Sequence, residues 1–98
     1  MKITKNDIIS YSQEHSPLGG KRTTLETEDL VISIVGGRSG LYGDFVNDFE
    51  LAIFERETKS FVTRNYIQEL NDDVAGYLNG DELLEIINPL LEKGFRVI

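Results

Sequence analysis

The chain of 98 residues contains no cysteine and no tryptophan, and only one histidine. Without cysteine it has no disulfide framework, no thiol nucleophile and no Cys-ligated zinc or iron–sulfur site. No window approaches the roughly 18 consecutive apolar residues of a membrane helix. The first residues also lack the apolar segment of a secretory signal. These absences favour a cytoplasmic protein that does not cross a membrane.

Positive charge is missing from one long stretch of the chain. The 17 Asp and Glu against 10 Lys and Arg give a formal charge of −7. Neither lysine nor arginine occurs between Arg64 and Lys93, and the acidic residues there account for the whole excess: Glu69, Asp72, Asp73, Asp81, Glu82, Glu85 and Glu92. Binding to phosphate backbones requires lysine and arginine, so direct nucleic-acid binding is disfavoured. A basic site on a protein partner is electrostatically favoured.

The length and the hydrophobic pattern predict a single small acidic α+β domain over residues 1–98. A first helix is expected over 5–14, with Thr4 as N-cap and Ile3 and Ile8 as a hydrophobic staple. Strands are expected over 22–27, 30–35, 45–55 and 60–63, where apolar residues alternate. A second helix follows Asn79 or Asp81, with a kink or break at Pro89, and a short strand ends the chain.

The expected fold is therefore an antiparallel sheet of about three to five strands, with the N-terminal and C-terminal helices packed on one face. The side chains that we expect in its core are Ile8, Leu30, Ile32, Ile34, Leu51, Ile53, Val62, Leu83, Ile86, Ile87 and Leu90.

A glycine-rich segment, residues 36–44, separates two of the predicted strands. A phosphate-binding loop would need a Lys-Ser or Lys-Thr pair that enters a helix, whereas a strand follows here. The segment is therefore interpreted as a connecting loop. Its exposed Arg38 and Tyr42 are candidate partner contacts, because Tyr and Arg are enriched in binding hot spots.

Residues 71–82, from Asn71 to Glu82, follow part of the spacing of a calcium-binding loop. Asn71 and Asp73 occupy the first and third positions, Gly76 the sixth and Glu82 the twelfth. However, Ala75 occupies the fifth position, where an oxygen ligand is needed, and no second loop of this kind is found. The other interpretation is a turn followed by a capped helix, which needs no metal and no cofactor.

The sequence offers little for catalysis. His15 stands alone beside a Pro-Gly turn, and no serine has the context of a nucleophile elbow. Asp48 and Glu50 would share one face of a strand, as a pair of catalytic carboxylates could, but a solvated strand face opposite the core explains them much better. We expect a protein that is not an enzyme.

The leading hypothesis is a non-enzymatic interaction or inhibitor domain whose acidic C-terminal surface engages a basic site on another protein. Its candidate contacts are Glu69, Asp72, Asp73, Asp81, Glu82 and Glu85, together with Arg38 and Tyr42. In size, charge and lack of catalytic groups the chain is similar to small acidic inhibitors of phages and mobile elements, some of which imitate nucleic-acid charge, and to toxin-neutralising immunity proteins. The expected partner is a protein with a basic surface, and a nucleic-acid-binding protein is one such partner. A calcium-binding regulatory module and a structural accessory subunit that pairs through a strand edge are the alternatives.

Overall fold

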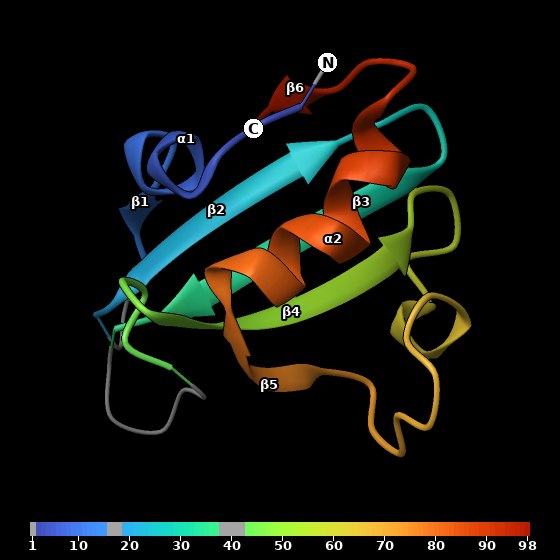
Figure 1. The fold of residues 1–98 in the computed structure, drawn as a ribbon. Helices are drawn as coiled ribbons and strands as arrows, with labels where there is room; N and C mark the ends of the chain where they lie inside the picture. Colours follow the sequence, from blue (N-terminus) through green and yellow to red (C-terminus); the bar gives the residue numbers. More distant parts are fainter. Residues whose placement is uncertain (1, 16–18, 38–42) are drawn as a thin grey trace.

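A computed structural model of the chain describes residues 2–15, 19–37 and 43–98. Most of the described chain forms one twisted sheet that a helix crosses (Figure 1). In chain order the elements are α1 (Lys5–Ser10), β1 (Gln13–Glu14), β2 (Lys21–Glu26), β3 (Leu30–Gly36), β4 (Asp48–Glu55), the 3₁₀ turn η1 (Thr63–Asn65), β5 (Ala75–Asn79), α2 (Gly80–Leu91) and β6 (Arg96–Val97).

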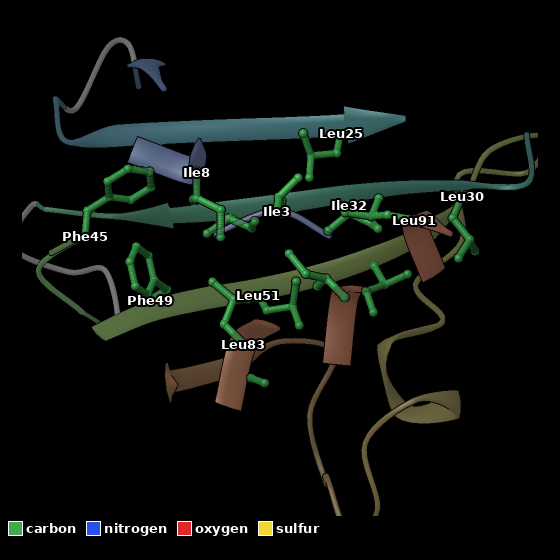
Figure 2. Close-up of a cluster of buried hydrophobic side chains, with 14 residues drawn as sticks. Ile3, Ile8, Leu25, Leu30, Ile32, Phe45, Phe49, Leu51, Leu83 and Leu91 are labelled. Carbon is green, nitrogen blue, oxygen red and sulfur yellow. The ribbon is translucent and has the colours of Figure 1, made fainter. Parts of the chain in front are cut away.

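The sheet is antiparallel throughout and has six strands. Five of them lie in the order β1-β2-β3-β4-β5, and β6 pairs with the end of β2. Alternate residues of the three long strands are buried on one face, as the period of two predicts. The core therefore lies between that face and α2, and Leu30 and Leu91 are at one end of it, with Phe45 and Phe49 at the other (Figure 2).

The helix α2 turns an apolar stripe towards the sheet and an acidic one away from it. Its N-cap Asn79 accepts a hydrogen bond from the backbone N–H of Glu82, whose carboxylate accepts one from the N–H of Asn79. This capping box fixes where the helix begins. The side chains at 83, 87 and 91 are fully buried, whereas those at 81, 82, 85 and 92 are exposed.

The predicted arrangement of the helices is wrong. The sheet has six strands rather than three to five, and only α2 is long enough to lie across it. The expected helix over 5–14 ends at Ser10, because Gln13 and Glu14 pair with the start of β2 as an edge strand. With six residues, α1 buries one side chain, Ile8, and lies beside β1 and β2 rather than covering a face (Figure 1).

Two further sequence predictions need correction near the ends of β4 and α2. The strand expected over 60–63 is a single bridge between Phe54 and Phe61, after which the chain turns into η1. Thr63 is buried there, and its hydroxyl accepts a hydrogen bond from the N–H of Ile53. Pro89 does not split the helix, since α2 continues to Leu91, although position 89 has no N–H to donate to the carbonyl of Glu85.

The core is largely as predicted. Of the expected core residues, Val62, Ile86 and Leu90 are only partly buried and the others are buried. The fully buried residues that the sequence analysis missed include Leu25, Phe49 and Leu91. None of the helices in the described ranges combines the length and the apolar composition that crossing a bilayer requires.

Candidate functional site

The acidic block that the sequence places between Arg64 and Lys93 is divided in two by β5. Glu69, Asp72 and Asp73 precede this strand, and the acidic residues of α2 follow it. Five extended residues span about 16 Å. The segment between η1 and β5 accordingly lies at the opposite end of β5 from the start of α2 (Figure 1). The predicted partner contacts therefore form two separate groups.

Several of these acidic residues have partners within the chain. The Asp73 carboxylate lies 3.5 Å from the Arg64 guanidinium, and both side chains are exposed. Asp72 accepts a hydrogen bond from the N–H of Asp73. Glu69 has a positive φ of 63° in the same segment. Glu82 belongs to the capping box of α2, so its carboxylate has a structural role at the helix start.

The remaining acidic residues of α2 form one continuous stripe. Asp81, Glu85 and Glu92 are exposed, and positions 81, 85, 88 and 92 recur at the spacing of one helix face. At 1.5 Å per residue the stripe is about 16 Å long. The carboxylates of Asp81, Glu85 and Glu92 make no hydrogen bond or ion pair with the described residues. We call these three residues the α2 stripe.

The N-terminal segment lies along the same side of α2. The Asn88 side chain accepts a hydrogen bond from the backbone N–H of Ile3 at 3.0 Å and donates one to the Ile3 carbonyl at 3.2 Å. This two-way contact places Lys2 beside the α2 stripe, where it lines a shallow groove with Asp81, Glu85 and Glu92. Among the described residues, Lys2 is the one cation that lines this groove.

Apart from the acidic block between Arg64 and Lys93, another group of acidic residues lies at one end of the sheet. It consists of Glu28 and Asp29, in the turn between β2 and β3, and Glu55 and Glu57, where β4 ends. Leu30 and Glu55 are paired in the sheet, and the backbone N–H of Arg56 donates to the Asp29 carbonyl at 2.8 Å. Two segments that are far apart in the sequence thus meet here.

Both turns are held by hydrogen bonds of their own. The Thr27 hydroxyl accepts bonds from the N–H groups of Asp29 and Leu30. On the other turn, the Lys59 N–H donates to the Glu55 carbonyl at 2.8 Å, and Lys59 has a φ of 63°. The four carboxylates are therefore carried on ordered backbone.

Between these turns lies a hollow of about 760 Å³. We call it the sheet-end hollow. Leu30, Val62 and Tyr66 give it apolar surface, and the four carboxylate residues and Arg56 line it with Asn65. Tyr66 is 41% exposed and also lines a smaller hollow of about 270 Å³ with Leu90, Glu92 and the cation Lys93. The α2 stripe and the sheet-end hollow therefore adjoin at Tyr66.

The cation nearest the sheet-end hollow is already engaged. The Arg56 guanidinium lies 3.6 Å from the Glu26 carboxylate and donates to the Glu28 carbonyl at 3.2 Å. Arg96 also pairs with Glu26. Neither arginine pairs with any of the four carboxylates of the hollow, which make no side-chain hydrogen bond or ion pair with the described part of the chain.

Sequence reasoning missed the sheet-end hollow because its acidic residues are balanced by basic residues along the chain. The signal that could have found it is the pairing of the strand ends, since the turn after β2 and the turn after β4 fall at the same end of an antiparallel sheet. Arg38 and Tyr42, the predicted contacts of the glycine-rich loop, lie outside the described residues.

The base of the glycine-rich loop is tightly built. The Gly37 N–H donates to the Gly43 carbonyl at 3.0 Å. Gly43 has a φ of 141°, and a Cβ at this position would lie 2.5 Å from the carbonyl oxygen of Asp48. Only glycine fits this close approach of two backbone segments. Next to it, Phe45 is buried and packs edge-on against Phe49 at 5.3 Å between ring centroids.

Asp44 stabilises this base electrostatically. One of its carboxylate oxygens accepts hydrogen bonds from the backbone N–H groups of Val46, Asn47 and Asp48, at 2.7–3.1 Å. The hydrogen bonds from Asn47, Val46 and Asp48 lower the pKa of Asp44 from 3.8 to about 2. The charged form is the one that these donors favour.

The lowered pKa predicts how stability depends on pH. The folded-state pKa is below the unfolded one, so the contribution of Asp44 is present above about pH 4 and is lost as the pH falls towards 2. We expect the melting temperature of Asp44→Ala to be lower than that of the wild type at pH 6, with the difference shrinking by pH 2. A difference that is the same at both pH values, measured by thermal unfolding, would contradict this assignment.

The calcium-loop interpretation of residues 71–82 finds no support in the geometry. Residues 75–79 are an extended strand, and the carboxylate of Glu82 is used for capping. In residues 2–15, 19–37 and 43–98 no three His, Asp or Glu side chains are grouped so that they could hold a metal ion. Asp48 and Glu50 lie on the face of β4 opposite the core, as a strand pattern requires.

No protein-family model, curated protein or solved structure matches this chain.

Proposed function

We propose that the protein is a non-enzymatic interaction domain that binds a basic site on a protein partner through the α2 stripe and the sheet-end hollow. The observation that carries this proposal is the meeting of the two acidic groups at Tyr66. Together they bring seven carboxylates, Asp81, Glu85, Glu92, Glu28, Asp29, Glu55 and Glu57, around adjoining surfaces, none of them paired within the described chain.

The energetics favour a binding role over a folding role for these charges. Like charges four residues apart on a helix, as at 81 and 85, destabilise it by a few tenths of a kcal/mol. Like charges on neighbouring strand ends are destabilising as well. A surface that retains such repulsion loses some stability, and a basic partner would offset this cost on binding.

The third acidic group, Glu69, Asp72 and Asp73, contributes less in this proposal. It lies at the opposite end of β5 from the start of the α2 stripe, and the charge of Arg64 partly neutralises it. An inhibitor that occupies the basic site of a nucleic-acid-binding protein is the form of the proposal that the overall negative charge fits best.

Self-association through a strand edge is less well supported. At one edge β1 and β6 are two residues long each, and at the other β5 is bulged against β4 with Tyr77 at a φ of 55°. Short and bulged edge strands are the devices by which proteins avoid pairing between sheets.

Site-specific cross-linking tests the proposal and identifies the partner. A photo-reactive p-benzoylphenylalanine replaces Glu85 in the centre of the α2 stripe, and in a matched control it replaces the exposed Glu14 at the end of β1. We expect one protein to be cross-linked in the source cells from position 85 and not from 14, at a peptide rich in Lys and Arg. Equal cross-linking from both positions, or attachment to an acidic surface, would refute the proposal.

A further inference from the structure

We infer that the sheet-end hollow receives an arginine side chain of the protein partner, with its stem on the apolar surface, its guanidinium against the Tyr66 ring and its charge facing the carboxylates. This inference rests on the proposed function and specifies which chemical group the partner supplies. It is carried by the combination of a cavity, an exposed aromatic ring and charge complementarity.

The hollow has room for a long side chain and a lining that suits one. Its volume of about 760 Å³ falls within the range of about 300–1,000 Å³ that is typical of whole ligand sites, so an arginine side chain would occupy only part of it. Leu30 and Val62 give an apolar surface on which the methylene groups of an arginine can pack while the charged head stays at the rim. An apolar ligand would leave the surrounding carboxylates desolvated without compensation.

Tyr66 favours a guanidinium over other cations. Its side chain is partly exposed. Its backbone comes directly after η1, whose residue Thr63 is hydrogen-bonded to β4. The Tyr66 N–H donates to the Thr63 carbonyl at 3.1 Å, so its backbone is held. A planar guanidinium stacks on such a ring and still donates to carboxylates at its edge, which a compact ammonium group does less well.

The carboxylates of the hollow are carried on two different turns, an arrangement that suits the several N–H donors of a guanidinium group. Glu28 and Asp29 reach the hollow from the turn after β2, and Glu55 and Glu57 reach it from the end of β4. Bidentate contacts between arginine and a carboxylate are among the strongest hydrogen bonds in proteins. Arg56 does not fill this role itself, because it is engaged with Glu26 and with the Glu28 carbonyl.

The test uses the full chain and three short probes. These are acetyl-Gly-Arg-Gly-amide, the same peptide with citrulline, which has the shape of arginine without its charge, and the same peptide with lysine. Each is titrated into isotopically labelled protein at low salt, and binding is followed by NMR. We expect the arginine peptide to shift the signals of Leu30, Val62 and Tyr66 in a saturable way, the lysine peptide to bind several-fold more weakly, and the citrulline peptide to leave them unmoved.

Variants of Tyr66 distinguish an arginine site in the sheet-end hollow from general electrostatic attraction between a cationic peptide and the acidic protein. Tyr66→Ala is expected to weaken binding of the arginine peptide by about fivefold to tenfold, whereas Tyr66→Phe, which keeps the ring, retains it. Tyr77→Ala is the matched control, since Tyr77 is 65% exposed on β5. Equal effects of Tyr66→Ala and Tyr77→Ala, or shifts spread over all acidic residues, would overturn the inference.

Two further outcomes are also decisive. If spermidine or magnesium chloride shifts the same signals as strongly as the arginine peptide, the hollow is a general cation surface and the arginine site is refuted. If Tyr66→Ala binds the cross-linked partner normally while changes in the α2 stripe abolish binding, the arginine site is refuted and the interaction function stands.

Discussion

Ile87→Ala is expected to lower the free energy of unfolding by about 2–5 kcal/mol, a large part of the roughly 5–15 kcal/mol that holds a domain of this size together. Ile87 is fully buried at the middle of α2, the one long helix that covers the sheet in the described chain. Its truncation would leave a cavity between the helix and the sheet. Urea denaturation followed by circular dichroism measures the loss.

Ile86→Ala is the matched control for this substitution. The two residues are neighbours of the same type in the same helix, but Ile86 is only partly buried. The control therefore removes the same atoms at the same cost in helix propensity, and we expect about 1 kcal/mol or less. If both variants lose equal stability, α2 is rotated from the described orientation, and the acidic stripe does not face solvent as we describe.

The second large effect concerns binding. Reversing the α2 stripe with Asp81→Lys, Glu85→Lys and Glu92→Lys is expected to weaken binding of the cross-linked partner by about 100-fold or more, because like charges facing each other across an interface cost several kcal/mol. All three side chains are exposed and unpaired within the described chain, so the fold is expected to remain. Calorimetry with the purified partner measures the affinity.

The chain provides a control with the same change of charge. Glu69→Lys, Asp72→Lys and Asp73→Lys together alter the net charge by the same amount, but in the segment that β5 separates from the start of α2. We expect the affinity to fall by less than about tenfold, the effect of long-range charge alone. This comparison also distinguishes the two halves of the acidic block, which the sequence treats as one.

Local patterns predicted the elements better than their arrangement. The caps at Thr4 and Asn79, the alternation of β3 and β4 and the apolar stripe of α2 all depend on residues within a few positions, and the structure confirms them. The length of α1 could not be predicted in this way. At the end of the helix the Ser12 hydroxyl donates to the Ile9 carbonyl, and Gln13 leaves the helix because it pairs with Arg22, a residue outside the local pattern.

The same limit explains the errors at the candidate site. Residues 75–79 include Gly76 and Asn79, residue types that are common in turns. They nevertheless form a strand, because they pair with the edge of β4. The sheet-end hollow does not show in any local sequence pattern, since Asp29 and Glu55 become neighbours only through the register of β3 and β4. The distribution of charge along the sequence pointed to the acidic residues of α2, whereas the sheet topology was needed to find the sheet-end hollow that adjoins them.

The measurement that tests the proposed function most directly is the dissociation constant of the complex at about 50 and 300 mM salt, for the wild type and for the α2-stripe triple variant. An acidic surface that binds a basic one predicts that the wild-type affinity falls by about tenfold or more with salt, and that the residual binding of the variant, which keeps only the carboxylates of the sheet-end hollow, depends on salt less steeply. A wild-type affinity that does not change with salt, or a variant that binds as the wild type does, would contradict it.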